Sequence, residues 1–178
     1  MRGSRCGGTS SGSFAGRTRA KMTSEPILND DFRDLLAELE RAAADFLVVG
    51  GFAVSAYGYQ RSTKDLDVFV RPTLDNARRV LRAIGAFGAP LHETSVDDLA
   101  TPGLVLQLGV APRRIDILNQ IEGVAFDEAA AHRTLAAFGS MEVPIIGRDA
   151  LIKNKLAVGR PEDLKDVRKL QAIAAKGR

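Results

Sequence analysis

Hydrophobic and polar positions along this chain follow two spacings, one typical of helices and the other typical of strands. Four apolar side chains between residues 30 and 44 recur every three or four positions, which predicts an amphipathic helix capped by Asn29 or Asp30. Similar patterns predict helices at residues 74–84, 126–135 and toward the C-terminus, with a helical turn at 96–100 inside an irregular stretch, 85–102. Short apolar runs predict strands around residues 46–49, 65–70, 104–110, 114–118 and 141–146. The mixture predicts an α+β fold in which helices pack on a small mixed sheet.

The second predicted strand carries two carboxylates. Asp65 and Asp67 are two positions apart, so their side chains point to the same face while their apolar neighbours point into the core. Two like charges side by side are unfavourable without a cation between them, and Mg²⁺ prefers such oxygen ligands together with substrate phosphates. Upstream, Gly50 and Gly51 lie where a strand ends and a helix begins, a place where backbone N–H groups can approach a phosphate. This order predicts nucleotide chemistry.

A third carboxylate follows on a later strand. Asp116 lies between two isoleucines in the strand at 114–118, which forms a predicted hairpin with its predecessor around residues 111–113. If this strand pairs beside the strand of the first two acids, three carboxylates converge and can hold two metal ions for in-line displacement at phosphorus. The alternative is a structural ion pair of Asp116 with Arg113 or Arg114.

Together these residues resemble the nucleotidyltransferase superfamily, which has a DNA polymerase beta-like fold. The family pattern is glycine followed by glycine or serine, a spacer, two acids separated by one apolar residue, and a later acid on a strand; residues 50–67 and Asp116 match it. The run Arg-Ser-Thr-Lys-Asp-Leu-Asp at 61–67 resembles the R-x-T-x-D-x-D of AbiEii-type and related minimal bacterial nucleotidyltransferases, and 151–170 resembles their closing segment. The resemblance spans about residues 46–170 and implies a nucleotidyltransferase-like core followed by C-terminal helices.

The resemblance also implies a role for each matching residue. The catalytic acids, which would bind two Mg²⁺ ions, are Asp65, Asp67 and Asp116. The residues that would contact the nucleotide are Gly50, Gly51, Arg61, Thr63, Lys155 and Arg160. Many family members have serine in place of Gly51, so phosphate binding here would rest on backbone N–H groups. Lys153 is the alternative to Lys155, and the C-terminal basic residues can instead form a solvated helix face.

The implied function is metal-dependent transfer of a nucleoside monophosphate from a nucleoside triphosphate, such as ATP, to a hydroxyl acceptor, with release of pyrophosphate. The acceptor stays open among RNA, a protein and a small molecule. The AbiEii-type resemblance implies a toxin–antitoxin system with a cognate toxin or antitoxin as partner. One alternative is a regulatory or partner-binding module that binds nucleotide without transferring it. Another is a protein whose acids form only structural ion pairs.

The charge distribution separates the first 21 residues from the rest. The chain has 178 residues, which favours a single domain, with 25 basic and 22 acidic side chains. Five of the basic residues and none of the acidic ones lie in residues 1–21, so residues 22–178 carry 20 basic against 22 acidic. This near-neutral part gives no argument for nucleic-acid binding. The Gly-, Ser- and Arg-rich start predicts a disordered tail or leader, with Met22 as the natural start of the domain.

Other absences in the sequence exclude several classes of protein. The one cysteine, Cys6, lies in the predicted tail, so no disulfide or cysteine metal site can form within the chain. No apolar run approaches the ~20 residues that cross a membrane, which predicts a soluble cytoplasmic protein. The two histidines lack metal-ligand spacing, and the absence of a P-loop pattern excludes a Walker-type ATPase.

Overall fold

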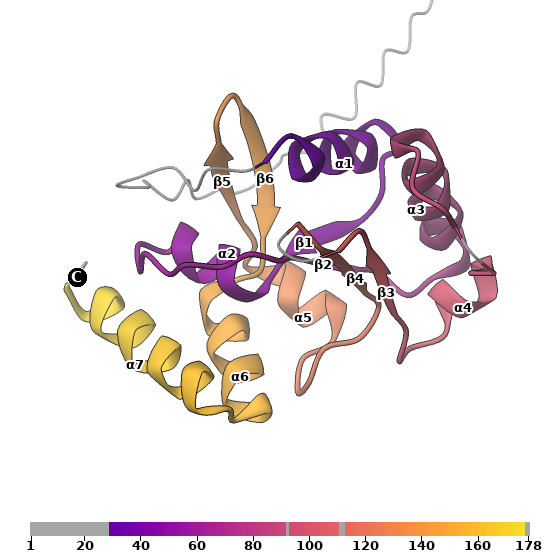
Figure 1. Ribbon diagram of the computed structural model, residues 1–178. Helices are drawn as coiled ribbons and strands as arrows, with labels where there is room; N and C mark the ends of the chain where they lie inside the picture. The colour runs from indigo at the N-terminus through magenta and orange to yellow at the C-terminus, as the bar shows by residue number, and fades with distance from the viewer. Residues whose placement is uncertain (1–28, 92, 111–112, 177–178) are drawn as a thin grey trace, which may run out of the picture.

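The computed structural model describes residues 29–91, 93–110 and 113–176 (Figure 1). The predictions for residues 1–21, for Cys6 and for the turn at 111–112 lie outside these ranges. The helices are α1 (Asp30–Arg41), α2 (Gly50–Ala56), α3 (Leu74–Phe87), α4 (Val96–Ala100), α5 (Phe126–Ala131), α6 (Arg148–Val158) and α7 (Pro161–Lys176). The strands are β1 (Phe46–Val48), β2 (Leu66–Val70), β3 (Val105–Leu108), β4 (Ile115–Leu118), β5 (Thr134–Phe138) and β6 (Met141–Ile145).

The strands form one mixed sheet in the order β3-β4-β2-β1-β6-β5. The central strand β2 pairs antiparallel with β1 and parallel with β4, and β1 pairs parallel with β6. The hairpins β3–β4 and β5–β6 complete the two edges of the sheet. The predicted α+β fold with helices on a mixed sheet is therefore confirmed, as is the pairing of the third-acid strand beside β2.

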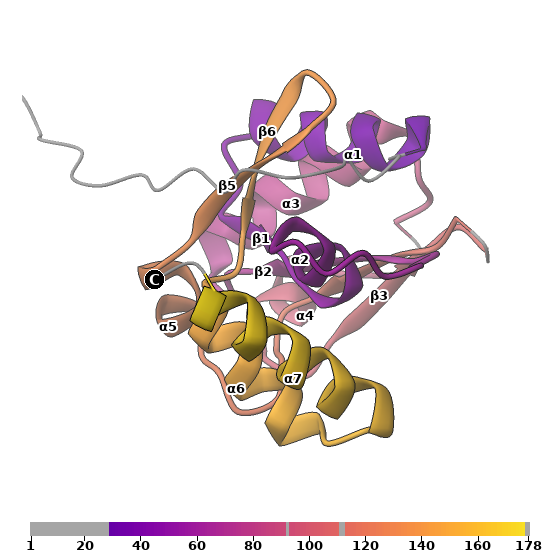
Figure 2. The ribbon, with the colours of Figure 1, turned by 90° about the vertical axis from the view of Figure 1, so that its left-hand side faces the viewer.

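Apolar side chains at the centre of the sheet are fully buried, among them Leu66 and Val68 of β2 and Ile117 of β4. Helix α1 contributes the four apolar residues that the sequence pattern placed on one face, and the ring of Phe32 packs edge-on against Phe52 of α2 at 5.7 Å. In both views α1 and α3 lie together at one end of the molecule, and α6 and α7 pair at the other (Figures 1 and 2). The sheet between them sets where the site residues lie.

One prediction of secondary structure was wrong at the end of the fifth helix. The predicted helix at 126–135 ends at Ala131, and residues 134–138 form β5 instead. Backbone pairing with all five residues of β6 overrides the helix propensity of this alanine-rich segment, and Gly139, with φ at 64°, makes the turn between the two strands. Two helix ends also differ from the prediction. Helix α1 is shorter and ends at Arg41, whereas α3 continues to Phe87 and is capped by Gly88 in the left-handed conformation.

Candidate active site

The parallel pairing of β2 and β4 places the predicted acids on one face of the sheet. Asp67 lies opposite Asp116 in the register, and Asp65 precedes β2 by one residue. Side chains at paired positions of neighbouring strands point the same way, and so do side chains two positions apart on one strand. Three carboxylates from two separate segments therefore face a common region.

The electrostatic surroundings of Asp67 show how crowded this region is with negative charge. Burial, together with repulsion from Asp116 and Asp65, raises the pKa of the Asp67 carboxyl to about 6. Lys155 and Arg114 oppose this shift without cancelling it. An additional cation among these three acids would favour the ionised form of Asp67.

The glycine pair at the start of α2 lies directly against the acids and the loop before them. Gly50 has φ at 61°, and a Cβ atom added there would lie 2.0 Å from Asp67 Oδ2. A Cβ atom at Gly51 would lie 2.7 Å from Thr63 Oγ1. Both positions therefore lack room for a side chain, and Gly50 also adopts a left-handed backbone that favours glycine. The structure brings Gly50, Gly51 and Thr63 beside the carboxylates.

Arg114 also lies in this site, where the sequence suggested it only as an alternative partner of Asp116. Its Nε lies 2.9 Å from Asp116 Oδ1, and its Nη2 lies 3.1 Å from Asp116 Oδ2 and 3.0 Å from Asp65 Oδ2. Asp65 Oδ1 is buried and has no hydrogen-bond partner. The signal in the sequence was the spacing, because Arg114 is two positions before Asp116 and so shares its face of the strand.

A second group of charges, the α7 ion-pair cluster, joins the ends of α6 and α7 to the loop before β2. Its centre is Lys155, which is 4% exposed and whose Nζ lies 2.9 Å from Asp163 Oδ1 and 2.8 Å from Asp166 Oδ2. Arg61 pairs with Asp166, and Arg160 Nε lies 2.8 Å from Asp163 Oδ2. Three predicted nucleotide-binding residues thus lie together, and the two aspartates of the closing segment are their partners.

The α7 ion-pair cluster lies close enough to the carboxylates to act on them. The charge of Lys155 lowers the pKa of Asp67, and the charge of Asp67 contributes to the raised pKa of Arg160, for which the hydrogen bond with Asp163 is the largest cause. Lys153, the alternative to Lys155, is exposed on α6, and its Nζ lies 2.7 Å from Glu128 Oε1. Lys155 is therefore the lysine whose charge acts on Asp67, whereas Lys153 lies at the surface.

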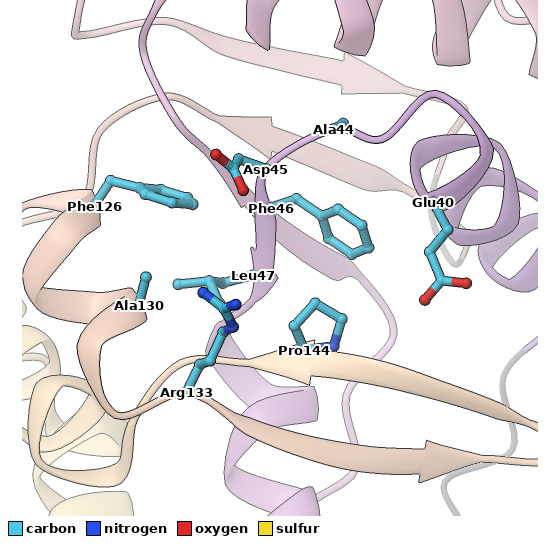
Figure 3. Close-up of a pocket in the computed structure, with 9 residues that line it drawn as sticks. All are labelled: Glu40, Ala44, Asp45, Phe46, Leu47, Phe126, Ala130, Arg133 and Pro144. Carbon is cyan, nitrogen blue, oxygen red and sulfur yellow. The ribbon is translucent and has the colours of Figure 1, made fainter. Parts of the chain in front are cut away.

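One hollow borders the site and another lies away from it. One, of about 260 Å³, borders the α7 ion-pair cluster and is lined by Tyr59, Arg61, Ser62, Glu162, Lys165 and Asp166. The other, of about 250 Å³, lies at the start of β1 and is lined largely by apolar side chains, with Glu40, Asp45 and Arg133 around them (Figure 3). In the antiparallel β1–β2 pair, Phe46 at this end faces Val70, three residues beyond Asp67, so the second hollow is separate from the carboxylates.

The acids fit the chemistry of a divalent cation, although they are not assembled around one. In the described residues, no group of three or more histidine, cysteine, aspartate or glutamate side chains is arranged to hold a metal ion as it stands. Yet Asp65, Asp67 and Asp116 share a face, one oxygen of Asp65 is buried without a partner, and Asp67 has a raised pKa. Hard oxygen donors of this kind are those that Mg²⁺ prefers.

The fold and this arrangement of acids and glycines define a protein of the nucleotidyltransferase class. Residues 28–178 match the family described as "Nucleotidyl transferase of unknown function (DUF2204)", and the chain belongs to that family. No curated protein matches the chain. This family match confirms the resemblance to the nucleotidyltransferase superfamily.

Solved structures of similar fold include an adenylyltransferase and a putative nucleotidyltransferase. A lincosamide antibiotic adenylyltransferase, LnuA, with lincomycin bound is 14% identical, with a TM-score of 0.55, and the match covers 83% of this chain and 98% of that one. A putative nucleotidyltransferase from Thermotoga maritima is 16% identical, with a TM-score of 0.52 and coverage of 83% and 96%. The antibiotic-resistance factor ANT(2'')-Ia is 13% identical, with a TM-score of 0.51 and coverage of 83% and 89%. At these identities the comparison establishes a shared fold.

Proposed function

We propose that this protein is a divalent-metal-dependent transferase that moves a nucleoside monophosphate from a nucleoside triphosphate to a hydroxyl acceptor. The observation that supports this most strongly is the position of Asp65, Asp67 and Asp116 on one face of the sheet, directly beside Gly50. Acids this close cost free energy unless they serve a cation. The position of these acids beside the start of α2 suits a ligand that carries both phosphates and metal ions.

In this proposal the three aspartates hold two Mg²⁺ ions. The metal ions supply Lewis-acid stabilisation of the phosphates and lower the pKa of the attacking hydroxyl. Asp116, on the strand next to β2, would lie nearest the acceptor and orient its hydroxyl for in-line attack on the α-phosphorus. The triphosphate would approach the backbone N–H groups at the start of α2. The two glycines there let the side chains of Asp67 and Thr63 pack close to that backbone.

In this proposal the predicted basic residues have two different roles. Arg160 is exposed and Arg61 is partly exposed, so both can turn toward phosphates while keeping a carboxylate partner on α7. Lys155 is buried between two carboxylates, and direct contact with a phosphate would break both pairs. We therefore assign Lys155 to holding α6 against α7 and to raising the local potential at Asp67. Thr63 shapes the loop against Gly51.

A small molecule with a free hydroxyl is the acceptor we propose. Two proteins of similar fold, a lincosamide antibiotic adenylyltransferase and an antibiotic-resistance factor, support this choice. The part of the chain after residue 21 carries 20 basic and 22 acidic residues, which supplies no broad basic surface for RNA. A cognate toxin or antitoxin as acceptor, as the AbiEii-type resemblance implies, is the competing outcome of the experiment below. No helix among the described residues is long and apolar enough to cross a bilayer.

The test is incubation of the purified protein with Mg²⁺, each α-³²P-labelled nucleoside triphosphate, and three acceptor pools: a small-molecule extract, total RNA and lysate protein. We expect label on a small-molecule fraction with the wild type and none with Asp65→Asn/Asp67→Asn. Glu93→Gln, which changes an exposed acid outside the site, is the matched control and should transfer normally. Nucleotide binding without label on any pool would instead indicate a binding module, and label on RNA or protein would correct the acceptor.

A further inference from the structure

The guanidinium of Arg114 lies between two of the three carboxylates that the proposed function assigns to the metal ions. It makes a two-point contact with Asp116, from Nε to Oδ1 at 2.9 Å and from Nη2 to Oδ2 at 3.1 Å. The same Nη2 reaches Asp65 Oδ2 at 3.0 Å. Both oxygens of Asp116 and one oxygen of Asp65 are therefore engaged by one positive group. These oxygens are also the donors that a metal ion would need.

The pairing of β2 with β4 fixes the position of the Arg114 backbone. Its carbonyl oxygen accepts a hydrogen bond from the N–H of Leu66 at 3.0 Å, which fixes the residue next to Asp65 at the point where β2 and β4 begin to pair. Being two positions before Asp116, its side chain leaves the strand on the same face as the acids. The neighbouring Arg113 is exposed. The guanidinium is thus built into the site by the strand register.

One guanidinium does not satisfy three carboxylates. Arginine keeps its charge at any ordinary pH, so the site carries one permanent positive group against Asp65, Asp67 and Asp116. Asp65 Oδ1 stays buried without a hydrogen-bond partner. A buried carboxylate oxygen without a hydrogen-bond partner is costly, and a cation bound beside it would satisfy it. The arrangement holds the acids in position but leaves them short of positive charge.

We propose that Arg114 is an internal counter-ion that exchanges partners during substrate binding. It holds Asp65 and Asp116 in the metal-free protein, releases them when a divalent cation binds, and then pairs with the phosphates of the nucleotide. The planar fork of a guanidinium matches phosphate oxygens as well as carboxylate oxygens, so the same group can serve both states. This inference rests on the proposed function, because it takes the three carboxylates as the metal ligands.

If Arg114 exchanges partners, it weakens the binding of metal alone and strengthens the binding of metal together with nucleotide. A purely structural ion pair would not have both effects. Metal alone must compete with Arg114, so the empty site binds metal weakly. Metal together with nucleotide binds better, because the phosphates offer the displaced guanidinium a new partner. Metal and nucleotide then each raise the affinity of the site for the other. Removing Arg114, which carries this coupling, reduces the effect of each ligand on the binding of the other.

The test measures Mn²⁺ binding by calorimetry, first alone and then with a nucleoside triphosphate analogue that has a methylene between its α- and β-phosphates. We expect Arg114→Gln to bind Mn²⁺ alone about tenfold more tightly than the wild type, since a unit charge a few ångströms from the cation is gone. We expect the same variant to bind the analogue with Mn²⁺ about tenfold more weakly, since a charged phosphate contact is gone. Arg113→Gln, which removes the neighbouring exposed charge, is the matched control and should change both constants little.

Thermal unfolding in EDTA shows whether each variant is folded. Arg114→Gln should unfold at a lower temperature than the wild type without metal, yet gain more from added Mn²⁺. Arg114→Lys keeps the charge without the fork, so it stays testable if the glutamine variant fails to fold, and its Mn²⁺ affinity should lie between the other two. Mn²⁺ binding to Arg114→Gln that is no tighter than to the wild type overturns the proposal, and so does analogue binding that is not weakened. Either result leaves the proposed function standing where the wild type still transfers label.

Discussion

Gly50 and Asp67 lie so close together that the glycine has no room for a side chain. A Cβ atom at Gly50 would lie 2.0 Å from Asp67 Oδ2, and Gly50 also has φ at 61°. The start of α2 and the middle acid of the site are therefore packed against one another where β1 and β2 lie side by side. The spacing of the glycine pair and the acids in the sequence corresponds to a direct contact in space.

Replacing Gly50 with alanine should damage both the fold and the site. The added methyl group must push the Asp67 carboxylate away, and the left-handed backbone adds strain, for a total loss of about 1–3 kcal/mol in the free energy of unfolding. Urea denaturation measures this loss, and label transfer should fall with it. The control is Gly85→Ala in α3, where no atom lies within 4 Å of the new Cβ; it should gain up to about 1 kcal/mol. Equal stability of the two variants would contradict the contact.

Gly51→Ser would restore the serine that many nucleotidyltransferases have, and here it should be destabilising. The new Cβ would lie 2.7 Å from Thr63 Oγ1 and 2.8 Å from Thr63 Cβ, so the loop before β2 must shift, at a cost of about 1–3 kcal/mol. The double variant Gly51→Ser/Thr63→Gly removes the opposing atoms. Urea denaturation should show a smaller effect of Gly51→Ser in the Thr63→Gly background than in the wild type. Additive losses would mean that the two positions do not interact.

Asp67→Asn should change stability in a pH-dependent way in EDTA. The pKa of Asp67 is about 6 in the folded protein against 3.8 in the unfolded chain. Because the folded-state pKa is raised, the protonated group contributes stability that is full below pH 3.8 and is lost as the pH rises through 6. The uncharged asparagine should therefore stabilise the protein by up to about 3 kcal/mol at pH 8 and by little near pH 4. Urea denaturation at both pH values checks this, with Glu93→Gln as an exposed control that should show no such difference.

Lys155→Met should be far more harmful than the same change two residues earlier. Lys155 is buried and holds Asp163 and Asp166, so its loss leaves buried carboxylates short of a partner, at a cost of about 3 kcal/mol. Lys153 has a half-exposed pair with Glu128, and Lys153→Met should cost less than about 1 kcal/mol. Chemical denaturation measures the free energy of unfolding of both variants. Similar losses would argue against a central role of Lys155 in the α7 ion-pair cluster.

Much of the fold was predictable because its signals are local. The helical spacing of apolar residues marked α1 and α3, and the hairpin of β3 and β4 followed from two apolar runs around a short turn. The predicted helix at 126–135 wrongly included the start of β5, because this alanine-rich segment becomes a strand only through its partner β6. Pairing between strands is a tertiary interaction, and local propensity does not contain it.

The sequence by itself determined which residue types the site has, since the glycine pair and the spacing of Asp65 and Asp67 follow from short-range rules of strands and turns. Tertiary structure alone decided which charges meet. The parallel register of β2 and β4 set Asp116 opposite Asp67 and brought the guanidinium of Arg114 to Asp65 from 49 residues away in the chain. The packing of α7 turned Asp163 and Asp166 into partners of Lys155. Electrostatic interactions depend on distance in space, and only the folded chain fixes that distance.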